Sequence, residues 1–167
     1  MAFREISVEE LKDNPFTLIN KDWMLITAGN REKHNTMTAS WGGVGELWGR
    51  YVSTIYMRPQ RYTLEFEERE DYYSLCFFGP EYRQALNLCG SKSGREVDKD
   101  AATGLTPCFD EAAPYYEQAR LVFLCRKLYR QDLEEGCFLD KGLLEKWYDN
   151  DLHRMFIGEI VKVLEKE

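Results

Sequence analysis

The stretch NTMTASWGGVGELW, residues 35–48, decides the fold. Its first half alternates apolar and hydroxyl side chains, the period-two pattern of a strand: Met37, Ala39 and Trp41 against Thr36, Thr38 and Ser40. The strand runs into Gly42-Gly43, where the backbone can bend sharply and approach a ligand. A row of hydroxyls that ends in a glycine turn suits a flat ligand with a polar edge, with Trp41 or Trp48 over its face. An ordinary threonine-rich strand is the alternative interpretation of this pattern.

Strand patterns also dominate the rest of the chain. Further strands are predicted at 16–19, 23–28, 51–57, 73–78, 115–117, 120–128 and 153–164, and short helices at 59–70, 81–89, 100–104 and 142–148. Another short helix is predicted to start at Ser7 and to stop before Asn14-Pro15. Gly90 is the expected C-terminal cap of the helix over 81–89. Because the helices are short insertions between hairpin-like pairs, the pattern favours an antiparallel barrel or sandwich over a parallel sheet. No linker interrupts residues 1–167, so a single domain is expected.

Composition narrows the class of protein and its partners. The 167 residues carry a formal net charge of −7, which argues against a nucleic-acid partner because the phosphates would be repelled. No apolar run approaches the roughly 18 residues that a membrane helix needs, and the N-terminus lacks the apolar segment of a signal peptide. The five cysteines have no CxxC spacing, which favours free thiols. We therefore expect a cytoplasmic protein that binds neither membrane nor nucleic acid.

Two basic segments are candidate anion sites. Arg58 and Arg61 flank Pro59 where a strand is expected to meet a helix, and arginine pairs and helix N-termini both favour phosphate. The loop SKSGREVDK, residues 91–99, is a second candidate, although it lacks the Walker spacing. The alternatives are surface arginines that balance an acidic helix and a simple solvated loop. Both segments together favour a phosphorylated ligand.

Histidine chemistry has few candidates in this chain. His34 lies in a polar turn, where exposure is expected, and His153 follows Asp151 at the start of the last predicted strand. Such a histidine is either a pH-sensitive contact to substrate or a structural hydrogen-bonding residue. The sequence supports no Ser-His-Asp triad, no metal-ligand spacing and no GxGxxG fingerprint.

Four motifs resemble those of the flavin reductase family with the FMN-binding split β-barrel, which includes flavoredoxin-like proteins. In chain order they are NxMTxSWG from Asn35, RPxRYT from Arg58, SGRxxDK from Ser93, and DxHxxFxGEI from Asp151. The resemblance covers nearly the whole chain. It implies a mainly β fold with short helices, a Greek-key split β-barrel of the FMN-binding type, which pairs as a homodimer with FMN near the interface.

The resemblance also implies roles for particular residues. The isoalloxazine edge would lie along the hydroxyl strand, at Met37, Thr38, Ala39, Ser40 and Trp41. The ribityl phosphate would lie near Arg58, Arg61, Thr63, Ser93, Gly94 and Lys99, with Arg95 a weaker candidate that can point outward. His153 would approach the reactive face, where a nicotinamide could stack, and is the one catalytic candidate.

Three functions fit this resemblance. The first is an NAD(P)H-dependent flavin oxidoreductase that passes electrons to free flavin or to a partner. The second is a flavoredoxin-like electron-transfer protein, whose fixed FMN is reduced by a redox protein partner. The third is a non-redox flavin or haem-type binding module on the same barrel. The sequence does not separate the first two, because no motif reports an open space over the flavin ring.

Overall fold

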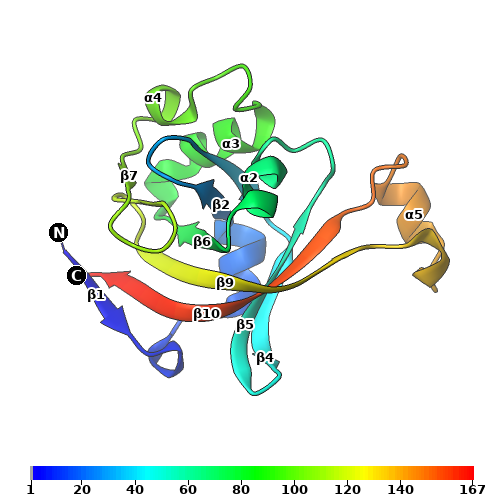
Figure 1. The fold of residues 1–167 in the computed structure, drawn as a ribbon, viewed down its shortest axis with the longest axis horizontal. Helices are drawn as coiled ribbons and strands as arrows, with labels where there is room; N and C mark the ends of the chain where they lie inside the picture. The colour runs from blue at the N-terminus through cyan, green and yellow to red at the C-terminus, as the bar shows by residue number, and fades with distance from the viewer. Residues whose placement is uncertain (1) are drawn as a thin grey trace.

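The structure is a computed structural model that describes residues 2–167. One antiparallel sheet of eight strands forms most of it, in the order β3-β2-β6-β9-β10-β5-β4, with β1 paired to β10 (Figure 1). The strands are β1 (Phe3–Ile6), β2 (Met24–Gly29), β3 (His34–Ala39), β4 (Gly42–Leu47), β5 (Arg50–Met57), β6 (Tyr72–Phe77), β9 (Leu121–Asp132) and β10 (Arg154–Lys166). Within residues 2–167, β3 and β4 do not pair with each other, so the sheet does not close. The predicted mainly β fold with short helices is confirmed.

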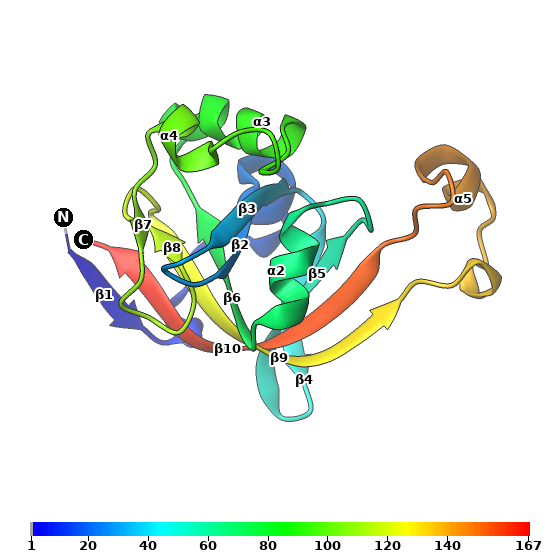
Figure 2. The same ribbon diagram turned by 45° about the horizontal axis from the view of Figure 1, so that its top comes forward.

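Short helices and a two-stranded ribbon complete the structure. The helices are α1 (Pro15–Thr17), α2 (Thr63–Arg69), α3 (Arg83–Ser91), α4 (Lys99–Thr103) and α5 (Gly142–Trp147). Three short turns of 3-10 helix are η1 (Val8–Glu10), η3 (Pro80–Tyr82) and η4 (Glu135–Cys137), and η2 (Leu18–Asp22) is a π-helical turn. The ribbon pairs β7 (Pro107–Cys108) with β8 (Tyr115–Tyr116). Helices α3 and α4 lie together on one side of the sheet (Figure 2).

Alternating apolar residues fill both faces of the central strands. In β9, Leu121, Phe123 and Cys125 belong to the core inside the barrel, and Val122 and Leu124 to a second core on the other face. The second core also includes Leu86 and Cys89 of α3. A strand that is apolar on both faces must be covered on both, which explains why the chain places α3 against the outer face.

The glycine pair Gly42-Gly43, which follows β3, was wrongly predicted to form a turn. Gly42 and Gly43 are instead the first residues of β4, which pairs with β5. The chain turns one step earlier, at Ser40 and Trp41, and Gly42 takes a φ of 154° that side chains rarely adopt. This corner moves the chain from β3 at one end of the sheet order to β4 at the other.

Two other expectations were wrong, and one strand was missed. Residues 16–19 were predicted to form a strand but are helical, because Asn14 caps the N–H of Phe16 and Pro15 suits a first turn. Strand β1 was not predicted. Gly90 is not a cap, since α3 continues to Ser91. A Cβ on Gly90 would lie 3.3 Å from the Cβ of Thr38, so this glycine lets α3 approach β3 closely.

An arm extends from the barrel between the two longest strands. It comprises residues 133–153, from the end of β9 through α5 to the start of β10, and projects from the rest of the molecule (Figure 2). Leu139 in this arm is 99% exposed, and Leu143 and Trp147 are also exposed. Asp151 and His153 of the DxHxxFxGEI motif lie at the end of the arm, and the rest of the motif lies in β10.

Replacing Gly158 with alanine is expected to destabilise the fold by about 1–3 kcal/mol through overpacking. A Cβ there would lie 2.3 Å from the hydroxyl oxygen of Tyr73, which is fully buried and bonded to Ser53 Oγ at 2.6 Å. Chemical denaturation measures the loss. Gly45→Ala is the matched control, because its Cβ would meet nothing within 4 Å. Equal stability of the two variants would contradict this account of the barrel interior.

Candidate functional site

The corner between β3 and β4 opens into a cavity of about 460 Å³. We call it the corner cavity, and its walls are Met37, Thr38, Ala39, Ser40, Trp41, Tyr56, Arg58, Arg61, Trp147 and His153. Eight of these ten are residues that the sequence predicted, from three motifs that lie far apart in the chain. The other two, Tyr56 and Trp147, were missed. The volume falls in the range of small-molecule sites, about 300–1,000 Å³.

The predicted row of free hydroxyls does not form. Thr36 is buried, and its hydroxyl lies 2.8 Å from that of Thr27. Thr38 donates its hydroxyl proton to the carbonyl of Leu86 at 2.5 Å, which ties β3 to α3. Among the residues described here, Ser40 alone of the three has a hydroxyl without a hydrogen bond. Ser40 is therefore the hydroxyl of this row that can bond a ligand in the corner cavity.

Aromatic rings form one wall of the corner cavity. Trp41 meets Trp147 of the arm edge to face, with ring centroids 5.0 Å apart, and lies 5.4 Å from the ring of His153. Trp41 is 39% exposed, so it shields the cavity and does not fill the core. Trp48 lies at the β4–β5 turn against Tyr129 and lines no part of this cavity.

A half-buried arginine and a buried lysine converge on the end of α3. Arg61 donates to the carbonyls of Gly90 at 3.0 Å and Cys89 at 3.5 Å, and Lys99 donates to those of Cys89 at 3.0 Å and Thr36 at 2.6 Å. Burial lowers the pKa of both, that of Lys99 to about 8, with the nearby Arg61 charge adding to the effect on Lys99. Across residues 2–167 neither cation has a carboxylate partner. Positive charge is therefore concentrated here, in a protein whose net charge is −7.

Lys99 lines a second cavity of about 460 Å³. The Cys89 carbonyl links its wall to that of the corner cavity, because it accepts hydrogen bonds from both Arg61 and Lys99. We call this second cavity the loop cavity, because Gly94 and Arg95 of the basic loop also line it. A Cβ on Gly94 would lie 2.1 Å from Asn35 Oδ1, so only glycine lets the loop approach β3 this closely. Arg95 pairs with Glu65 at 2.5 Å.

Thr63 and Ser93 line neither the corner cavity nor the loop cavity. Thr63 is buried at the start of α2 and accepts a hydrogen bond from Asn35 Nδ2 at 2.9 Å. The Ser93 hydroxyl accepts from the N–H of Arg95 at 3.2 Å. Both side chains thus hydrogen-bond a residue that lines the loop cavity.

Arg58 lines the corner cavity but also holds the arm. Its guanidinium donates to Asp151 Oδ2 at 2.8 Å and to the carbonyl of Trp147 at 2.9 Å, and it lies 4.9 Å from the ring centroid of Tyr148. Hydrogen bonds from the Asp149 N–H, from Gln60 and from Arg58 lower the pKa of Asp151 to about 2. Arg58 is therefore less free to meet an anion than Arg61.

The two histidines differ in their surroundings. His153 is 7% exposed, and its Nδ1 lies 2.7 Å from the hydroxyl of Tyr148. Burial, and then the Arg58 charge, lower the pKa of His153 to about 4. His34 was expected to be exposed, and this is wrong: it is half-buried, with Nε2 2.7 Å from Asp100. The sequence analysis missed Tyr148, although it stands beside Trp147 just before the Asp151 motif.

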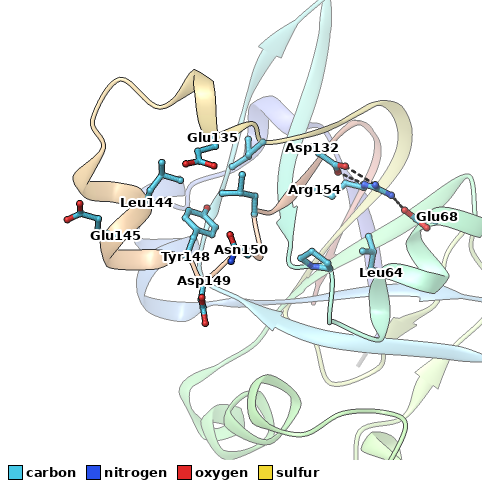
Figure 3. A pocket seen from close by; sticks show the side chains of 13 residues that line it. Leu64, Glu68, Asp132, Glu135, Leu144, Glu145, Tyr148, Asp149, Asn150 and Arg154 are labelled. Atoms are coloured by element: carbon cyan, nitrogen blue, oxygen red, sulfur yellow. Dashed lines mark hydrogen bonds and ion pairs between the residues drawn. The ribbon is translucent and has the colours of Figure 1, made fainter.

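A further cavity, of about 790 Å³, lies between the arm and the barrel (Figure 3). We call it the arm cleft. Carboxylates of Glu68, Asp132, Glu135, Glu145 and Asp149 line it around leucine side chains, and the Arg154 guanidinium is paired with both Asp132 and Glu68. So acidic a cleft repels an anionic ligand. A phosphorylated ligand is therefore better matched by the corner and loop cavities.

No helix within residues 2–167 is long and apolar enough to cross a membrane.

A family model described as the flavin reductase like domain matches residues 17–167. The fold is that of split-barrel proteins, with an open sheet. A search of the curated proteins found no match.

Similar solved structures cover most of the chain. An FMN-binding domain of a flavin reductase-like enzyme from Shewanella baltica OS155 has a TM-score of 0.70 and 14% identity, covering 98% of this chain and 77% of that one. Flavoredoxin from Methanosarcina acetivorans has a TM-score of 0.68 and 21% identity, with 96% and 77% covered. An NADH:FAD oxidoreductase from Streptomyces globisporus, solved with NAD and FAD fragments, has a TM-score of 0.63 and 14% identity, with 87% and 74% covered.

Proposed function

Since this chain belongs to the flavin reductase-like family, we propose that it is a single-domain FMN-binding flavoprotein and an NAD(P)H-dependent flavin oxidoreductase. One observation supports this most. Eight of the predicted residues line the corner cavity. One of them, Arg61, shares the Cys89 carbonyl with Lys99, and neither cation has a carboxylate partner among residues 2–167. The alternative is a flavoredoxin-like carrier of electrons between proteins.

The residues present fit FMN in shape and in charge. We propose that the flat ring lies along Met37, Thr38, Ala39, Ser40 and Trp41, with the Ser40 hydroxyl and Trp147 bounding it. The phosphate lies toward Arg61 and Lys99, at the loop that Gly94 brings close to β3. Thr63, Ser93 and Arg58 support these groups. An anion there relieves the repulsion that helps to lower the pKa of Lys99.

Bound FMN would supply the transfer of electrons, and the chain supplies binding, orientation and exclusion of water. Trp41 and Trp147 cover the cavity from the solvent side. His153 presents a neutral ring at pH 7, because its pKa is about 4. We propose that this ring contacts the electron donor or acceptor above the flavin.

A His153→Ala variant is expected to keep FMN bound but to be reduced more slowly by its donor, about threefold to tenfold for one lost hydrogen bond. The reason is that His153 lines the corner cavity but is not one of the groups proposed to hold the phosphate. Stopped-flow reduction of the folded, FMN-loaded variant measures the rate. An unchanged rate across donor concentrations would remove His153 from the site.

Two measurements test the proposed function. Titration with FMN and with riboflavin tests the phosphate site, and equal affinities for the two would refute it. Mixing the FMN-loaded protein with NADH or NADPH without oxygen then tests the reaction, with loss of the flavin absorbance expected. No loss with either nucleotide, together with slow exchange of bound flavin, would favour the carrier.

We also propose a homodimer in the cytoplasm. The exposed apolar side chains of the arm, Leu139, Leu143 and Trp147, are suited to burial against a second copy. Light scattering that finds a monomer with flavin still tightly bound would contradict the dimer. The proposed partners are free flavin for the oxidoreductase and a redox protein for the carrier.

A further inference from the structure

We propose that Tyr148 is a positioning residue that fixes one neutral tautomer of His153, with the proton on Nε2 and that N–H turned toward the corner cavity. The effect on the reaction rests on the function proposed above. The tautomer itself does not, because it follows from contacts within this chain.

The hydrogen bond between the two side chains has one consistent direction. Tyr148 Oη lies 2.7 Å from His153 Nδ1. Burial raises the pKa of Tyr148, so the hydroxyl keeps its proton at neutral pH. In the described part of the chain this is the only hydrogen bond of that hydroxyl. If Nδ1 donated, this half-buried hydroxyl proton would have no acceptor among residues 2–167, and an unmet donor in a partly buried contact costs free energy. Tyr148 therefore donates and Nδ1 accepts.

A neutral imidazole with Nδ1 as acceptor carries its proton on Nε2. Tyr148 lines the arm cleft and not the corner cavity, whereas His153 lines the corner cavity. The Nδ1 atom thus faces Tyr148 and the arm cleft. Nε2–H lies beyond Cε1 from Nδ1, so it points away from Tyr148 and offers a donor to an acceptor atom of a bound ligand.

The charges around the pair keep both groups neutral. Arg58 lies 4.9 Å from the Tyr148 ring centroid, where its positive charge makes the hydroxyl a stronger donor. The same charge and burial hold the pKa of His153 low, while Asp151 acts in the opposite direction but is itself paired with Arg58. The phenol ring of Tyr56 also packs against His153, with ring centroids 6.3 Å apart. Arg58 and Tyr148 together hold the arm against the barrel and orient His153.

Long-range ¹⁵N–¹H correlation of the two histidine side chains tests the tautomer at pH 7, first on the protein as purified and then with FMN added. A His153→Gln spectrum assigns the signals, since His34 is the only other histidine. We expect an unprotonated Nδ1 and a protonated Nε2 for His153. A protonated Nδ1 in the natural protein would overturn the proposal without any variant.

A Tyr148→Phe variant tests the positioning. The two ¹⁵N shifts of His153 are expected to move toward each other as both tautomers become populated, and reduction of the FMN-loaded variant to slow about threefold to tenfold, with FMN affinity unchanged. Tyr129→Phe is the control, because among residues 2–167 that exposed side chain's hydroxyl bonds only Gln131. Unchanged His34 signals show that the variant is folded. Unchanged His153 shifts in Tyr148→Phe would refute the positioning role. A failure of the natural protein to bind FMN would refute only the proposed function.

Discussion

An Arg61→Ala variant is expected to bind FMN about 10- to 100-fold more weakly, with no change in its affinity for riboflavin. Hydrogen bonds to charged groups contribute about 1.5–3 kcal/mol, and Arg61 is half-buried in the wall of the corner cavity. Fluorescence titration with each ligand measures the two affinities. Only the ligand that carries a phosphate should respond.

Two further variants make this prediction specific. Arg61→Lys keeps the charge and should recover part of the affinity. Arg50→Ala removes an exposed arginine that pairs with Glu159 on β10, and it should change neither affinity. If Arg61→Ala weakens FMN and riboflavin equally, then Arg61 acts through its bonds to Gly90 and Cys89 at the end of α3, and the phosphate assignment fails.

Raising the pH from 5 to 8.5 is expected to cost the natural protein about 4 kcal/mol of unfolding free energy through Glu67 alone, at about 1.4 kcal/mol per pKa unit. Glu67 is fully buried inside the barrel near Tyr73 and Cys125, and neither carboxyl oxygen has a hydrogen bond within residues 2–167. Burial raises its pKa from 4.5 to about 8, only partly offset by Lys127. A raised pKa stabilises the fold fully below pH 4.5, and this stabilisation is lost as the pH rises through 8.

A Glu67→Gln variant isolates this contribution from those of other groups. His153, with a pKa lowered to about 4, acts in the opposite sense between pH 4 and 6.5, but it is the same in both proteins. Chemical denaturation should show similar stabilities near pH 5 and a more stable variant at pH 8.5. Parallel curves would contradict the assignment, and would mean that Glu67 is ionised and paired with Lys127.

Much of the fold could be predicted because buried strands leave a strong periodic pattern. The alternation in 120–128 was sufficient to identify β9, and a similar pattern identified β3. The helix at Pro15 and the strand at Gly42 could not be predicted in this way. The first depends on one cap from Asn14, and the second on pairing with β5, which lies several residues further along the chain.

The site was predicted only in part, because sequence motifs identify residues but not their tertiary contacts. Sequence motifs brought Ser40, Arg61 and His153 into consideration, and the structure places all three at one cavity. The sequence could not predict that the Thr38 hydroxyl donates to the Leu86 carbonyl or that Arg58 bonds to Asp151 of the arm. Those facts depend on tertiary contacts between distant segments.

A crystal structure of the protein with FMN tests the central proposal most directly. We predict isoalloxazine density in the corner cavity along residues 37–41, with the phosphate within hydrogen-bonding distance of Arg61 or Lys99. FMN bound instead in the arm cleft, or in the corner cavity with its phosphate turned away from both cations, would contradict the account.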